Sequence, residues 1–219
     1  FRHLATADGL PGWELRVFYL WDFGVTATHD RQFNRRFQWD VDLLTGYAFE
    51  FVPNVAADPG THHFNGLDNP ALRARLVAYA PDAILLFGYA YRSQLGLALR
   101  PPAPLIFRGD SHLLGHRPPS LAKRTLLRLL FSRFTAITHV GQANRAYFRR
   151  FGVPDARLHF VPHCVDDAHF RLTPAVADRA QQQRLALGLT GKFVFLFAGK
   201  LVPDKDPAGL LDAFIAAKV

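Results

Sequence analysis

The chain has 219 residues, of which 49% are hydrophobic and 20% are charged, and this is enough apolar material for one full hydrophobic core and part of a second. No apolar run reaches the ~18 residues that a membrane-spanning helix needs, so we expect a cytoplasmic globular protein. The formal charge of +8 favours an anionic partner, such as a nucleoside diphosphate, an acidic lipid or a nucleic acid, without choosing among them.

Cysteine and methionine usage adds two expectations. The single cysteine, Cys164, excludes an internal disulfide and fits a reducing compartment. The sequence contains no methionine, even at position 1, and it ends soon after a strand and helix that should open a second domain. We therefore expect a fragment that is cut at both ends.

Strands and helices alternate along the first 161 residues. After the end of a helix at 1–6, the pattern predicts a strand at 13–20, an irregular stretch at 21–47, a strand at 48–52 and a helix at 70–79. An apolar run at 82–87 predicts a strand buried on both faces, and a helix follows at 91–99. Strands are predicted next at 104–108, 135–140 and 158–161, with helices at 120–134 and 142–151 between them. This alternation indicates a doubly wound parallel α/β sheet.

The last part of the chain repeats the strand-then-helix pattern. A helix is predicted at 177–187, where the chain passes between domains. The apolar run at 193–198 stops at Gly199 and predicts another strand buried on both faces. Asp206 followed by Pro207 is an N-cap with proline at the first helical position, so a helix should begin there.

Two lysines, Lys200 and Lys205, flank the turn between that strand and that helix. In open α/β sheets, ligands bind beyond the carboxyl ends of the strands, where two ammonium groups suit an anionic ligand. The alternative is a pair of solvated surface lysines.

The strand at 104–108 leads directly into a polar cluster, Arg108-Gly109-Asp110-Ser111-His112. A glycine at a strand end lets the backbone turn sharply near a ligand, while arginine, carboxylate and imidazole can divide anion binding and proton handling. The alternative is a helix cap beside an exposed histidine.

Four segments follow one another in the order and spacing of a known enzyme family. They are 147–154 (YFRRFGVP), 161–170 (VPHCVDDAHF), 184–189 (RLALGL) and 199–214 (GKLVPDKDPAGLLDAF). The sequence resembles glycosyltransferase family 4, a large group of retaining enzymes with the two-domain GT-B fold. The likeness covers roughly residues 104 to 219, and the preceding region fits only loosely.

The resemblance implies an α/β fold of GT-B type with two Rossmann-like domains. Residues 1–165 would form the acceptor-side domain, without its first strand. Residues 166–192 would form the linker between the domains and its helix. Residues 193–219 would be the truncated start of the donor-binding domain. The implied activity is transfer of a sugar from a nucleoside-diphosphate sugar to an acceptor hydroxyl with retention, in cell-surface polysaccharide or glycolipid synthesis. No metal or other cofactor is expected.

The resemblance also assigns roles to residues. Gly199, Lys200 and Lys205 would bind the donor diphosphate. The acceptor-side group beside the donor sugar would be Asp110 by position or His112 by residue type, and both stay open. Arg108 and Gly109 would contact substrate. The family's pair of glutamates that grips the donor would lie beyond Val219, so we expect negligible transferase activity from this chain alone.

The sequence departs from the family pattern in three places. His163-Cys164 replaces the usual Asn-Gly, Lys200 replaces an arginine, and Asp206 replaces a glycine. A lysine keeps a charge for a phosphate but loses the planar two-pronged contact of a guanidinium.

Other motifs support weaker interpretations. Asp40-Val41-Asp42 matches the manganese motif of the other large glycosyltransferase fold, but so short a pattern is common by chance, and His62-His63 lack metal-ligand spacing. The basic amphipathic helix at 120–134, with Leu126 on its apolar side, fits either ordinary packing on the sheet or peripheral contact with the inner face of a membrane.

Two other functions remain open. One is a different nucleotide-sugar enzyme on the same fold, an epimerase or a phosphorylase. The other is a non-enzymatic basic binding protein, but no recognition helix and no sheet face with interleaved aromatic and basic residues is apparent, so we expect no nucleic-acid partner.

Overall fold

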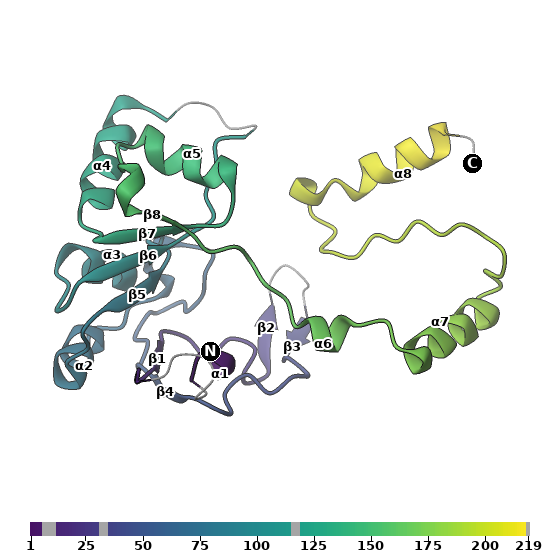
Figure 1. Ribbon diagram of the computed structural model, residues 1–219, viewed down its shortest axis with the longest axis horizontal. Helices are drawn as coiled ribbons and strands as arrows, with labels where there is room; N and C mark the ends of the chain where they lie inside the picture. Colours follow the sequence, from purple (N-terminus) through teal and green to yellow (C-terminus); the bar gives the residue numbers. More distant parts are fainter. Residues whose placement is uncertain (6–11, 31–34, 115–118, 218–219) are drawn as a thin grey trace. The chain divides into compact units, whose positions relative to one another are not determined.

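The computed structural model describes residues 1–5, 12–30, 35–114 and 119–217 (Figure 1). The chain divides into two compact units, of which the first comprises residues 1–28 and 38–163 and the second residues 29–37 and 164–219. Thr6, Lys218 and Val219, which fall inside the expected elements and domains, lie outside the described residues. None of the described helices is both long and apolar enough to cross a membrane.

A four-stranded parallel sheet forms the centre of the first unit. Its strands are β5 (Ile84–Phe87), β6 (Leu105–Arg108), β7 (Ala136–His139) and β8 (Leu158–Phe160), in that spatial order. The connecting helices are α3 (Arg92–Leu99), α4 (Leu121–Ser132) and α5 (Gln142–Arg150). All seven elements were predicted from sequence. The observed fold is therefore mixed α/β with a parallel sheet, as expected.

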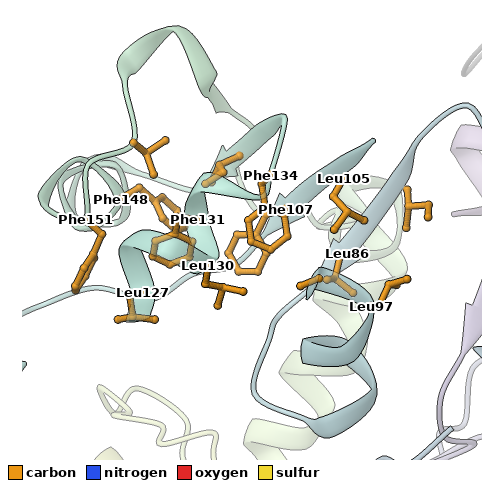
Figure 2. Close-up of a cluster of buried hydrophobic side chains, with 14 of the residues drawn as sticks. Leu86, Leu97, Leu105, Phe107, Leu127, Leu130, Phe131, Phe134, Phe148 and Phe151 are labelled. Carbon is orange, nitrogen blue, oxygen red and sulfur yellow. The ribbon is translucent and has the colours of Figure 1, made fainter. Parts of the chain in front are cut away.

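One face of this sheet carries the core. Leu86, Phe107 and Ile137 stand on the same side in neighbouring strands, because the register pairs Leu86 with Phe107 and Phe107 with Ile137. Side chains of α3, α4 and α5 pack on that side (Figure 2). Strands added in one direction through right-handed crossovers place their helices on a common face. The spatial order of these four strands follows their order in the sequence without a reversal. The four strands therefore show only one winding direction of the expected doubly wound sheet.

The prediction that β5 is buried on both faces is wrong. Burial alternates along the strand, and Leu85 and Phe87 are 45% and 48% exposed. The apolar run hid this alternation because its outward residues are as hydrophobic as its inward ones.

Aromatic rings fill the space between the sheet and α4 and α5. The Phe107 ring lies 4.8 Å from the Phe134 ring and 5.9 Å from those of Phe131 and Phe148, centroid to centroid. All four side chains are fully buried (Figure 2). Burial of each such ring is worth about 2–3 kcal/mol relative to exposure, so this cluster is a main source of stability in the unit.

Helix α4 packs on the sheet as an ordinary amphipathic helix. Ser120 caps it by accepting a hydrogen bond from the Lys123 N–H at 3.3 Å. Leu127, Leu130 and Phe131 are buried at helical spacing. Leu126, which we expected on the apolar side, is 63% exposed instead, because its neighbours already fill the stripe that faces the core.

A smaller parallel sheet joins β1 (Arg16–Tyr19) and β4 (Ala48–Phe51), with α1 (Arg2–Ala5) and α2 (Leu72–Tyr79) in the same unit. The strand predicted at 13–20 is thus shorter than expected. Two short strands, β2 (Thr28–Asp30) and β3 (Arg35–Phe37), pair with each other and lie almost entirely in the second unit. They were not predicted in the stretch expected to be irregular.

The second unit is mainly helical. It contains α6 (Asp167–Phe170), α7 (Pro174–Ala186), the 3₁₀ turn η3 (Pro203–Lys205) and α8 (Pro207–Ala216). The start of α8 confirms the sequence prediction, because the Asp206 carboxylate accepts a hydrogen bond from the Gly209 N–H at 3.1 Å. Asp206 has φ +44°, a left-handed conformation in which glycine is unstrained. A glycine at this place in the family pattern is therefore physically reasonable.

The strand predicted at 193–198 is wrong. Residues 192–198 have no regular secondary structure, and Phe193 and Leu196 are 81% and 84% exposed. A strand needs a neighbour for its backbone hydrogen bonds, and the described part of the second unit supplies none for this segment. Of the expected opening strand and helix, only the helix is observed.

Candidate functional site

A cavity of about 510 Å³ lies at the carboxyl edge of the four-stranded sheet. Its wall combines Tyr89, two residues after β5, with residues 110–113, which begin two residues after β6. Lys123 of α4 and Tyr147 of α5 complete its polar lining. Loops that follow adjacent parallel strands emerge at the same edge, and this is where open α/β sheets bind ligands.

The structure brings Asp110 and His112 together in this wall. Both side chains are exposed to solvent, and Ser111 lies between them in the same lining. A carboxylate accepts hydrogen bonds from hydroxyl groups, an imidazole can donate or accept a proton, and the Lys123 ammonium attracts an anion. The set suits a polyhydroxylated ligand that also carries negative charge.

Arg108 and Gly109 are next to this pair in sequence, but neither belongs to the cavity lining. The Arg108 guanidinium donates hydrogen bonds to the carbonyl oxygens of Val161, at 2.6 Å, and Pro162, at 3.5 Å. A Cβ on Gly109 would lie 2.8 Å from the Phe107 ring. In this structure Arg108 fixes the chain that leaves β8, and Gly109 lets the backbone pass close to a core ring.

Asn144 holds the cavity loop in place and was missed by sequence reasoning. Its amide nitrogen donates to the Ser111 carbonyl at 2.7 Å, and its oxygen accepts from the Val140 N–H at 3.0 Å. The side chain is buried. One amide thus connects the loop after β6 to the loop after β7. An available signal was its place in the first turn of α5, where side chains often reach back to the preceding backbone.

Tyr89 and Tyr147 were also missed as site residues. Their hydroxyl oxygens are 3.3 Å apart in the cavity wall. Burial, and then the hydrogen bond with Tyr147, raises the pKa of the Tyr89 phenol far above its ordinary value. Tyr89 therefore stays protonated at neutral pH and can donate a hydrogen bond. The signal was the position of Tyr89 after Gly88 at a strand end.

The predicted donor-site residues belong to the second unit. Gly199 and Lys200 follow the extended segment, with Lys200 half-buried, and Lys205 is the exposed last residue of η3. Their role in binding the donor diphosphate stays a prediction.

The Asp40-Val41-Asp42 motif lies in a turn of the first unit. The Asp42 carboxylate accepts hydrogen bonds from the N–H groups of Leu44 and Thr45, both at 3.1 Å, and pairs with Arg2 at 3.2 Å. Hydrogen bonds from Thr45, and then from Leu44, lower the pKa of the Asp42 carboxyl. Turn formation accounts for this aspartate without a metal.

No protein-family model matches the chain, and neither curated proteins nor solved structures provide a significant match. The likeness to glycosyltransferase family 4 therefore depends on the four sequence segments alone.

Proposed function

We propose that this chain contributes the acceptor side and the beginning of the donor side of a retaining, GT-B-type glycosyltransferase that resembles family 4. The observation that carries the proposal is the shared position of Asp110 and His112 in one cavity at the carboxyl edge of a parallel sheet. These are the two residues that the resemblance offers for the acceptor side, and the cavity is in the place where such sheets bind substrates.

The proposed reaction moves a sugar from a nucleoside diphosphate to an acceptor hydroxyl, on a carbohydrate or a lipid-linked sugar. The acceptor oxygen forms a bond to the anomeric carbon, and the bond from that carbon to the diphosphate oxygen breaks. The hydroxyl proton passes to the departing phosphate on the same face, which retains the configuration. Asp110 or His112 orients the acceptor or donor sugar. Lys200 and Lys205 stabilise the charge that grows on the leaving diphosphate.

Donor binding is tested by thermal denaturation with UDP, GDP, ADP and their glucose conjugates, on the longest natural chain that contains this sequence. A ligand that binds only the native state raises the apparent melting temperature. We expect one nucleotide family to raise it, and we expect Lys200→Ala and Lys205→Ala to abolish the shift. Lys192→Ala, which changes an exposed lysine of the same unit, is the matched control and should keep the shift.

The acceptor side is tested by sugar-transfer kinetics with the same chain and the nucleotide sugar that binds. Replacement of the residue that handles the proton or positions the hydroxyl, by Asp110→Asn or His112→Ala, should reduce turnover about 10²–10⁴-fold. Asp82→Asn and His159→Ala alter exposed residues of the same types outside the cavity and should leave turnover unchanged. Absence of both a nucleotide shift and sugar transfer would refute the proposal.

A further inference from the structure

A second cluster of ionisable side chains lies outside this cavity, on the loop between β4 and α2. Asp58, His62 and His63 each offer one donor atom, and these atoms all lie within 4.8 Å of one another. The Asp58 Oδ2 is 2.9 Å from the His62 Nε2 and 3.6 Å from the His63 Nε2. The sequence showed no metal-ligand spacing around these histidines, and it is the fold of the loop that creates the cluster.

The separations are close to those of metal ligands. Zinc binds nitrogen and carboxylate oxygen at about 2.0–2.1 Å, and in a tetrahedron this sets ligand atoms about 3.3 Å apart. The distances from the Asp58 Oδ2 to the two Nε2 atoms, 2.9 and 3.6 Å, lie on either side of that value. A metal ion could therefore replace the direct contacts after the side chains adjust, because the three donor atoms already lie within 4.8 Å of one another.

The loop that carries the cluster is held by contacts independent of a metal. The Gly60 N–H donates to the Gly66 carbonyl at 3.0 Å, and the Asn54 amide donates to the same carbonyl at 2.9 Å. The Tyr91 hydroxyl donates to the Thr61 carbonyl at 3.0 Å. A Cβ on Gly66 would lie 2.0 Å from the Gly60 oxygen, so the two segments of the loop are in contact through their backbones. Ligands on such a fixed loop lose little conformational freedom on binding.

The same loop sets the direction of one imidazole. A Cβ on Gly60 would lie 2.6 Å from the His62 Nδ1, so this edge of the ring rests against the backbone. The opposite nitrogen, Nε2, is the one near Asp58. The His62 and His63 rings are nearly perpendicular, at 80°, with centroids 4.5 Å apart. The His63 Nε2 lies 3.6 Å from the Asp58 carboxylate and 3.0 Å from the Asp58 carbonyl oxygen, and a metal ion would replace the carbonyl contact.

We propose that Asp58, His62 and His63 bind a divalent transition-metal ion of the zinc class. Two imidazoles and one carboxylate suit Zn²⁺, Co²⁺ or Ni²⁺, whereas Mg²⁺ and Ca²⁺ prefer oxygen ligands alone. Asp58 and His62 are exposed and His63 is half-buried, so water can complete the coordination. The ion would join the two ends of the 58–63 turn. This site is independent of the proposed sugar transfer.

The test measures metal binding to the full chain after treatment with a chelator and desalting. Equilibrium dialysis with Zn²⁺ should give one ion per chain, and Co²⁺ should give the visible absorption of a low-symmetry site. Asp58→Asn, His62→Ala and His63→Ala should each weaken Zn²⁺ binding at least about tenfold, since even residues that only support metal ligands cost that much. Far-UV circular dichroism checks that these surface variants fold.

The chain has ten histidines, His62 and His63 included. Matched controls separate binding at this site from nonspecific binding by the other histidines. His159→Ala and His169→Ala remove exposed imidazoles elsewhere and should leave the affinity unchanged. Zinc should also raise the melting temperature of the unmodified chain and of these controls, but not of the three ligand variants. Equal Zn²⁺ affinity in all six proteins, or no binding by the unmodified chain, would overturn the proposal.

Discussion

Buried amide side chains define the loops at the sheet edges of the first unit. Asn144 joins Ser111 to Val140, and Asn69 donates to the carbonyl oxygens of Leu20 and Val52, at 3.0 and 2.9 Å. Both side chains are buried, where polar groups need hydrogen-bond partners. Each amide therefore ties together loops that are distant in sequence. Asn144 holds the loop after β6, which lines the cavity.

Replacement of Asn144 should expose this role. Asn144→Ala leaves the Ser111 carbonyl and the Val140 N–H without their partner and should lower the free energy of unfolding by about 1–3 kcal/mol. Gln142→Ala, an exposed amide in the same helical turn, should change it by less than about 0.5 kcal/mol. Urea denaturation of the three proteins measures both values. Equal stability of the two variants would contradict the role assigned to Asn144.

At this scale, sequence reasoning identified the chemistry-bearing residues better than their supports. Asp110 and His112 stood out because ionisable residue types come shortly after a predicted strand. Asn144, Tyr89 and Tyr147 did not, because their importance comes from contacts with residues tens of positions away. A local pattern, such as Tyr89 after Gly88, marks the position of the residue but does not identify its contact partner.

Among the helices, α4 shows how packing selects between adjacent leucines. Leu127 is buried and Leu126 is exposed, although both belong to the same apolar stretch. The helix has room for one stripe of side chains against the sheet, and the spacing of Leu127, Leu130 and Phe131 fills it.

This pair provides a matched test on one helix. Leu127→Ala should lower the free energy of unfolding by about 2–5 kcal/mol because it leaves a cavity in the core. Leu126→Ala should change it by less than about 0.5 kcal/mol. Thermal or urea denaturation gives both numbers. Similar losses for the two variants would mean that α4 packs with a different face toward the sheet.

The prediction of element types succeeded in the four-stranded sheet and failed at 193–198. From β5 to β8 the strands and the helices have different hydrophobic periodicities and are separated by Gly and Pro. These local sequence patterns were sufficient to predict them. The run at 193–198 has an equally strong strand pattern but no hydrogen-bonding neighbour in the described chain. A strand is a property of a pair, and its sequence supplies only one member.

For the molecule as a whole, buried hydrophobic residues are confined to the first unit. They run from Val52 to Val153, and no residue of 164–217 whose side chain the structure describes is buried. Since burial of apolar surface is the main favourable term in folding, stability should be concentrated in the first unit.

Native-state hydrogen exchange tests this distribution. Amides of β6 and β7 should exchange only through global unfolding and be the slowest. Amides of α7 and α8 should open at a free-energy cost at least about 2 kcal/mol lower, because these helices bury little apolar surface. Uniform protection of both sets, measured by mass spectrometry or NMR, would show that the second unit folds as part of the same cooperative core.

The sequence by itself determined the class of fold, the succession of strands and helices from β5 to β8, the cap of α8 and the polar residues after β6. These depend on interactions between residues close along the chain, which periodicity and capping patterns record. Tertiary structure decided which face of the sheet is buried, which residues line the cavity and that Asp58 meets His62 and His63. Those outcomes depend on strand register, helix rotation and loop closure, which arise only when segments distant in sequence pack together.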